Sequence, residues 1–160
     1  MNLKPHLITA EGLAKITEDL KHLKTIDREE VADRLHRAFE DGQDDDFVDN
    51  AELEAARNAQ SFLEGRIKEL EEIIKNHQII KNNSEPHESV RVGDWVTVTE
   101  DGYDEEEKYM LVGAAEADPA NSRISNESPL GKALLGAKKG DIVRVNAPRG
   151  VLEFRVLKIG

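Results

Sequence analysis

The 160-residue sequence contains no cysteine, only one tryptophan and few other aromatic residues. Without cysteine, the chain has no disulfide framework, no zinc-thiolate site and no thiol nucleophile. Aromatic residues make up 4% of the sequence, whereas charged residues make up 34%. Because large apolar side chains are scarce, we expect a modest core, in one domain or in two small ones.

Long apolar runs and a positive net charge are also missing. No stretch approaches the roughly 20 apolar residues that a membrane-spanning helix needs, and the N-terminus lacks the apolar segment of a signal peptide. The sequence therefore predicts a cytoplasmic protein with no membrane partner. The net charge of -11 argues against sequence-independent binding to duplex nucleic acid, which depends on neutralising phosphates with Lys and Arg.

The stretch from Glu40 to Glu54 is unusually acidic. Eight of its fifteen residues are Asp or Glu and none is basic. Burying unpaired charge costs more free energy than folding returns, so these carboxylates must lie in water or at a ligand. Taken alone, such a charge run is typical of a solvated loop that keeps a protein soluble.

Two segments with helical spacing of apolar residues flank this acidic stretch. The first follows Thr9, a predicted N-cap, and its stripe has a slip around Ile26: Leu13, Ile16, Leu20, Leu23, Val31, Leu35 and Ala38. The second stripe is more regular: Leu53, Ala56, Gln60, Leu63, Ile67, Leu70 and Ile74. Helices joined by a short loop can bury such stripes only against each other. Residues 1–80 therefore predict an antiparallel coiled-coil hairpin with an acidic tip near 41–50.

The pattern changes after residue 80. Residues 81–89 contain several breakers and predict a linker. Beyond it, apolar residues alternate with a period of two, which predicts strands around Trp95 and over residues 108–112, 141–145 and 151–159. We expect Trp95 to lie in the core.

A short helix interrupts these strands. Ser128 is its predicted N-cap and Pro129 its first residue, and the helix should cover Leu130 to Leu135. Residues 90–160 thus predict a small domain of mixed composition, and the whole chain is assigned to the α+β class.

Several motifs resemble those of the bacterial Gre transcript-cleavage factors, the GreA/GreB-like elongation factors. Asp49-Asn50-Ala51-Glu52 is similar to the Glu-Asn-Ala-Glu motif at the tip of that family's hairpin. The segments Phe62–Ile67 and Ile124–Gly136 resemble two further signatures of the family. One four-residue match would be weak, but these matches occur in the expected order in both halves of the chain.

The resemblance implies a transcription elongation factor that is not itself an enzyme. It implies a monomer whose hairpin enters RNA polymerase through the secondary channel, while an FKBP-like C-terminal domain docks at the channel rim. There the factor would stimulate cleavage of the 3′ end of backtracked RNA, a reaction of the polymerase.

The resemblance also implies roles for particular residues. Family members present two acidic residues three positions apart, which match Asp46 and Asp49 here. These two are the expected catalytic residues and metal ligands, lent to the polymerase to help hold a shared Mg²⁺. Arg57 is the expected contact to the nascent RNA 3′ end. The expected polymerase-docking residues are Ser125, Ser128 and Pro129.

Departures at the tip leave a second function open. Asp49 stands where the family usually has Glu, and Asp44 and Asp45 are additional acidic residues that we expect to weaken ion delivery. A Gre-related group of inhibitors also carries several aspartates at its tip, and these proteins block the channel without stimulating cleavage. Stimulation and inhibition are therefore both retained as hypotheses.

Some of these residues also have simpler explanations. Arg57 could pair with Glu54, three positions earlier on the same helix. Arg34 and Arg37 could add to a basic patch, although Phe39 stands where the family often has a basic residue. Ser128 and Pro129 could serve only to start their helix.

Two other functional classes are weaker. An EF-hand loop beginning at Asp44 would need Gly and Glu at its sixth and twelfth positions, which are Asp49 and Ala55. A peptidyl-prolyl isomerase rests on analogy of fold alone, because the C-terminal half has few aromatic residues to line a proline pocket.

Overall fold

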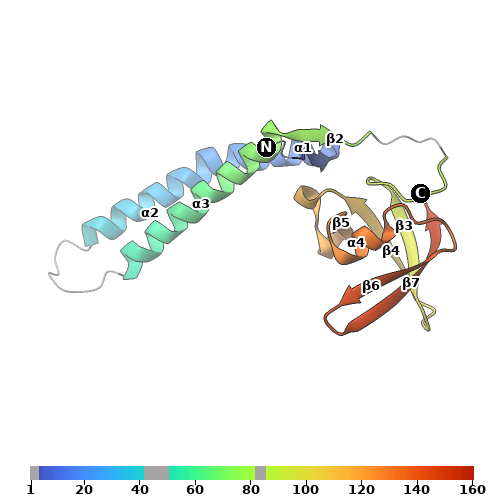
Figure 1. Cartoon of the computed structure of the whole chain (residues 1–160). Helices are drawn as coiled ribbons and strands as arrows, with labels where there is room; N and C mark the ends of the chain where they lie inside the picture. Colours follow the sequence, from blue (N-terminus) through green and yellow to red (C-terminus); the bar gives the residue numbers. More distant parts are fainter. Residues whose placement is uncertain (1–3, 42–50, 82–85) are drawn as a thin grey trace. The chain divides into compact units, whose positions relative to one another are not determined.

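The computed structural model describes residues 4–41, 51–81 and 86–160 (Figure 1). The chain divides into two compact units. One unit is Leu13–Asn76, and the other combines Met1–Gly12 with His77–Gly160. The first is helical and the second contains the strands, so the predicted α+β class is confirmed.

The helical unit is a hairpin of long helices. Its first arm runs through α1 (Ala10–His22), the π-helical turn η1 (Leu23–Asp27) and α2 (Arg28–Asp41). Its second arm is α3 (Ala51–Lys75), which lies beside α2 (Figure 1). Within the described residues, no helix combines the length and the apolar character needed to cross a lipid bilayer.

The slip in the apolar stripe corresponds to the π-helical turn. Both residues that flank η1, His22 and Arg28, have right-handed helical backbone angles, so the arm continues without a break. A π turn inserts extra residues into the helical repeat and therefore changes the phase of the stripe. Ile26 lies within this turn and is 49% exposed, whereas Ala38, on the continued stripe, is buried.

The interface of α3 follows the predicted stripe over most of its length. Its buried residues are Ala56, Leu63, Ile67, Leu70 and Ile73. Gln60, the polar member of the predicted stripe, is exposed, and Ile73 is buried where Ile74 was expected.

Ion pairs connect the two arms across the apolar interface. They are Lys24–Glu71, Arg28–Glu64 and Arg34–Glu52. The Arg28 pair is bidentate, because Nε and Nη2 each donate to one Glu64 oxygen at 2.8 Å. Exposed pairs add little stability, but a bidentate pair has a defined geometry, so this pair helps to fix the register of the hairpin.

The second unit contains a two-stranded parallel sheet that the sequence analysis did not identify. It pairs β1 (His6–Ile8) with β2 (His77–Ile79). Strands of three residues carry no measurable periodicity, which explains why they were missed. Ile8 is completely buried.

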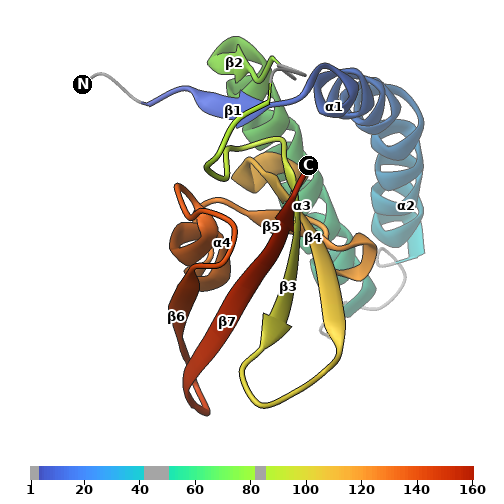
Figure 2. The ribbon, with the colours of Figure 1, turned by 90° about the vertical axis from the view of Figure 1, so that its right-hand side faces the viewer.

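The larger sheet has five strands in the order β5-β4-β3-β7-β6 (Figure 2). Its elements are β3 (Trp95–Glu100), β4 (Glu106–Val112), β5 (Arg123–Ser125), β6 (Ile142–Ala147) and β7 (Gly150–Ile159). All neighbouring strands are antiparallel except the pair β4–β5. Two short 3₁₀ turns, η2 (Ala114–Glu116) and η3 (Pro119–Asn121), connect β4 to β5. Helix α4 (Pro129–Leu134) packs near β6 and contributes the buried Leu134 to the core.

The prediction that Trp95 lies in the core is wrong. Successive side chains of a strand point to opposite faces, and Val96 and Val98 occupy the core face of β3. Trp95 is half-buried on the other face, where the Lys108 Nζ lies 4.9 Å from its ring centroid. The two residues of this cation–π contact are diagonal neighbours across β3 and β4, because Trp95 pairs with Met110 and Lys108 pairs with Thr97.

Candidate functional site

The candidate site lies where the hairpin arms approach the acidic segment. The predicted metal ligands Asp46 and Asp49 belong to residues 42–50, outside the described part of the chain. The site is therefore built here from the last turns of α2 and the first turns of α3. An open cavity of about 690 Å³ extends along α2 and reaches the start of α3; its lining residues are Glu30, Asp33, Arg34, Arg37, Ala38 and Glu52.

Arg34 does not add a free positive charge to this surface. Its Nε donates to Glu52 Oε1 at 2.7 Å. This hydrogen bond and the attraction between the charges raise the pKa of Arg34 and lower the pKa of Glu52. Glu52 belongs to the motif that begins at Asp49, so one acidic residue of that motif is held by the opposite arm.

Arg57 contacts an aromatic side chain instead of the predicted carboxylate. Its guanidinium carbon lies 5.8 Å from the ring centroid of Phe39, on the opposite arm. This distance is within the range of a cation–π interaction. Among the ion pairs of the described residues, none joins Arg57 to Glu54, so the local explanation for Arg57 is not supported.

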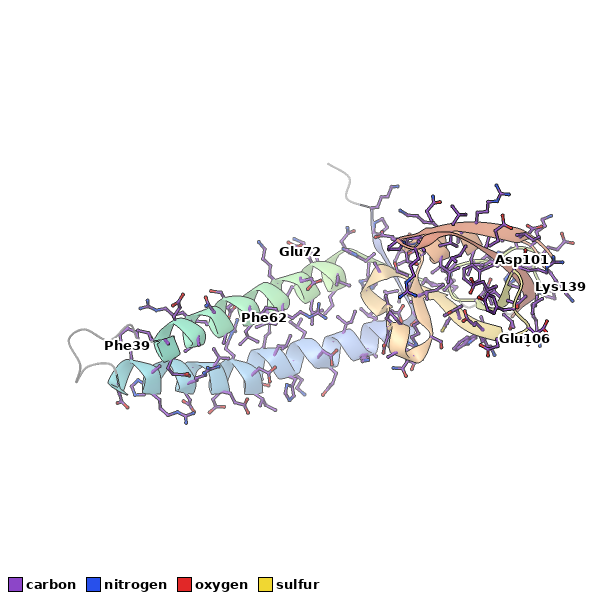
Figure 3. The ribbon with its side chains drawn as sticks, turned by 90° about the horizontal axis from the view of Figure 1, so that it is seen from below. Phe39, Phe62, Glu72, Asp101, Glu106 and Lys139 are labelled. Carbon is purple, nitrogen blue, oxygen red and sulfur yellow. The ribbon has the colours of Figure 1, made fainter. Side chains whose placement is uncertain are left out.

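Two small residues allow this contact. Ala38 of α2 is 2% exposed and Ala56 of α3 is 0% exposed, so both lie in the interface. Small side chains at an interface let helix backbones approach closely. Phe39 and Arg57 follow these alanines in the sequence, which brings them together at the edge of the interface; Phe39 is labelled in Figure 3.

The predicted docking residues surround the start of α4. Ser128 is its N-cap, as predicted: its hydroxyl oxygen accepts from the Gly131 amide at 3.0 Å, and its hydroxyl donates to the Ser125 carbonyl at 2.6 Å. The Ser125 hydroxyl accepts from the Glu127 amide at 3.0 Å. Pro129 is exposed at the first helical position. Of the three, Pro129 presents the most free surface, and the two serines have local structural roles.

The sequence analysis did not predict the contact between Thr9 and Glu116. Thr9 is the predicted N-cap, and its hydroxyl oxygen accepts from the Gly12 amide at 3.0 Å. In addition, the Thr9 hydroxyl and amide donate to Glu116 Oε1 and Oε2 at 2.6 and 2.7 Å. Glu116 is 9% exposed. No local sequence signal marks Glu116, because its partner is 107 positions away.

Over residues 4–41, 51–81 and 86–160, no group of three or more His, Asp or Glu side chains could hold a metal ion. The expected ligation by Asp46 and Asp49 therefore stays a prediction.

Family models match both halves of the chain. Residues 6–79 match the model described as "Transcription elongation factor, N-terminal". Residues 85–160 match "Transcription elongation factor, GreA/GreB, C-term". The chain belongs to the GreA/GreB family. The family membership predicted from the tip and C-terminal motifs is thus confirmed.

Individual GreA proteins match over nearly their whole length. The transcription elongation factor GreA of Thermoanaerobacter pseudethanolicus is 45% identical over 156 residues, which cover 98% of both chains. The GreA of Caldanaerobacter subterraneus subsp. tengcongensis is 44% identical over the same lengths. A solved structure of GreA factor homolog 1 (Gfh1) from Thermus thermophilus is 29% identical over 98% of this chain and 99% of that chain, with a TM-score of 0.44.

Proposed function

We propose that this GreA/GreB-family factor binds RNA polymerase and stimulates cleavage of the 3′ end of backtracked RNA. The polymerase carries out the hydrolysis, and the factor is an accessory and not itself an enzyme. The proposal rests on one observation: the two arms of the helical hairpin are joined through an acidic segment that contains the family's motif.

The hairpin has the dimensions of an arm that can reach into a channel. Helix α3 contains 25 residues, which correspond to about 37 Å at about 1.5 Å per residue. Its apolar side is buried, and apart from the exposed Phe62 its outer side is mostly charged or polar. Such an arm can extend into a partner without exposing a large apolar surface.

In this proposal Asp46 and Asp49 are lent to the active site of the polymerase. Carboxylate oxygens are ligands that Mg²⁺ prefers, so the residue types fit a shared magnesium ion. When bound, that ion would activate water and stabilise the leaving oxygen of the RNA. Asp49 has a side chain one methylene shorter than the Glu that the family usually has, which shortens its reach toward the ion.

Cleavage stimulation is favoured over channel inhibition by the comparisons. The relatives at 45% and 44% identity are both named transcription elongation factor GreA. The extra Asp44 and Asp45 still favour inhibition as the second candidate function, because they resemble the aspartate-rich tips of the inhibitors.

We assign polymerase docking to the part of the strand-containing unit around α4. Pro129 is exposed beside the two capped serines, so a partner can reach it without unfolding the helix start. We further propose that the factor acts as a monomer in the cytoplasm, with the nascent RNA 3′ end as its second contact.

The test uses purified elongation complexes stalled in a backtracked state. Release of short 3′ RNA fragments and the rate of nucleotide addition are measured with and without the full-length protein. We expect faster fragment release with the factor present. Slower release together with slower nucleotide addition would identify a channel blocker, and no change at saturating protein would refute action on the polymerase.

A further inference from the structure

Phe39 and Arg57 form an exposed pair beside the acidic end of the hairpin. Phe39 lies two residues before the end of α2, and its ring is 49% exposed although the guanidinium of Arg57 lies 5.8 Å from its centroid. Arg57 is also exposed, and within the described part of the chain it belongs to no ion pair. Both planar groups therefore keep surface available to a ligand.

Packing of the hairpin does not explain Phe39. The neighbouring Ala38 fills the interface position and is 2% exposed, so the ring lies at the edge of the interface. Because about half of its surface stays in contact with solvent, the Phe39 ring gains little free energy from burial in the interface. Of the four phenylalanines in the sequence, Phe47 falls within the acidic stretch and Phe39 just before it, and Phe39 lies at this end of the hairpin (Figure 3).

Aromatic rings and guanidinium planes are the groups on which unpaired RNA bases stack. We propose that Phe39 and Arg57 form a stacking platform for a base of the unpaired RNA 3′ segment. This inference rests on the proposed function, because it assumes that the hairpin reaches the backtracked RNA. It adds the chemistry of the contact: a base is held by its face, through an aromatic ring paired with one cation.

The chemistry of the pair favours stacking over a contact made only to phosphates. A base face carries no net charge and gains from both members of the pair, the Phe39 ring and the Arg57 guanidinium. A phosphate would gain only from the charge of Arg57.

The test compares two backtracked complexes that differ only in the unpaired RNA 3′ segment. One carries natural bases, and the other carries abasic nucleotides, which keep the phosphates but remove the stacking face. For each complex, the concentration of full-length factor that gives half-maximal cleavage is measured for the native chain, Phe39→Leu and Phe39→Trp. Phe62→Leu is the matched control, because Phe62 is 80% exposed on the same hairpin and does not contact Arg57 in the cation–π pair.

With natural bases, we expect Phe39→Leu to raise the half-maximal concentration about fivefold or more, the lower range for loss of one stacked base. Phe39→Trp should restore the native value, and Phe62→Leu should leave it unchanged. On abasic RNA, the native chain and Phe39→Leu should behave alike. Equal loss on both RNAs, or no rescue by Trp, would overturn the platform and point to a contact with a polymerase side chain.

A second readout separates this inference from the proposed function. A photoreactive thio-substituted base at the RNA 3′ end is crosslinked to the factor, and crosslinking requires no cleavage. A crosslink that depends on Phe39 supports the platform even if cleavage is not stimulated, whereas equal crosslinking by Phe39→Leu overturns it. Circular dichroism melting of each variant shows whether the hairpin itself is intact.

Discussion

At the scale of single residues, Thr9 and Glu116 connect two distant parts of the strand-containing unit. The Glu116 carboxylate accepts two hydrogen bonds from Thr9 and lies within 4.0 Å of an Arg123 nitrogen. A buried carboxylate needs such partners, because an unsatisfied charged group in the interior is costly. Gly12 is what makes room for it: a Cβ at position 12 would lie 2.0 Å from Glu116 Oε1.

A pair of glycine substitutions tests this anchor. Exchanging Gly for Ala in a helix usually stabilises it by about 0.5–1 kcal/mol. Gly65→Ala in α3 should follow that rule, because no atom lies within 4 Å of the added methyl group. Gly12→Ala should instead destabilise the protein by about 1–3 kcal/mol, since Glu116 must give up its hydrogen bonds to move. Urea denaturation measures both, and stabilisation by both substitutions would contradict the anchor.

Two substitutions of Ser128 test its structural role as the N-cap of α4. Ser128→Ala should lower the free energy of unfolding of the C-terminal unit by about 1 kcal/mol, the usual loss for a helix N-cap. Ser128→Asp keeps an oxygen that accepts from the Gly131 amide and should retain most of that stability. Unfolding is followed by Trp95 fluorescence, which reports on the same unit. If the Asp variant is as unstable as the Ala variant, the cap is not the origin of the effect.

Single residues were predictable where their role is local. The caps at Thr9 and Ser128 could be recognised because an N-cap is defined by its own side chain and the next few residues. Glu116 could not be recognised, because its importance arises from a partner brought close only by folding. Trp95 was placed incorrectly for a related reason: alternation shows that two faces exist, but which face is the core depends on the other strands.

At the scale of elements, the two arms of the hairpin are matched by apolar packing and by ion pairs. The bidentate Arg28–Glu64 pair lies just after the π-helical turn. The pair therefore holds α3 to Arg28, the first residue of α2 after the π-helical turn that shifts the apolar stripe. The hydrogen bond to Arg28 lowers the pKa of Glu64 below its ordinary value of 4.5.

This pair predicts a pH-dependent contribution to stability. Because the folded-state pKa of Glu64 is lowered, its contribution is fully present above pH 4.5 and is lost as the pH falls through the lowered value. Glu64→Gln should therefore reduce the melting temperature at pH 7, and the difference from the native chain should shrink at pH values below 4.5.

Both side chains of this pair are exposed, so the effect is small and should weaken in high salt. Glu72→Gln, a substitution on the same helix (Figure 3), is the control and should show no such pH-dependent difference. A melting difference for Glu64→Gln that stays constant down to low pH would show that charge pairing is not its cause.

The hairpin could be predicted in kind and in approximate extent, and even the slip at Ile26 was visible in the sequence. The form that the slip takes, a π-helical turn, could not be read from spacing alone, because a loop or a kink would shift the stripe equally well. The contact between Phe39 and Arg57 was also hidden. It depends on the close approach at Ala38 and Ala56, and the sequence places these residues on a shared interface without giving their register.

At the scale of the whole molecule, the chain divides into two units whose cores differ in kind. The body around α4 and the five-stranded sheet is stabilised by an apolar core, whereas the hairpin carries a narrow core and a charged exterior. Of the described acidic residues at the candidate site, Glu52 is paired with Arg34 of the opposite arm.

The most direct test of this function is the rate of RNA cleavage in a backtracked elongation complex, measured with isosteric variants across a range of Mg²⁺ concentrations. The native chain should accelerate cleavage, and Asp46→Asn and Asp49→Asn should each remove most of that acceleration, with partial recovery at high Mg²⁺. Asp19→Asn, an exposed position on α1, should behave like the native chain. Undiminished cleavage with both tip variants would contradict the proposal that this factor lends its carboxylates to the polymerase.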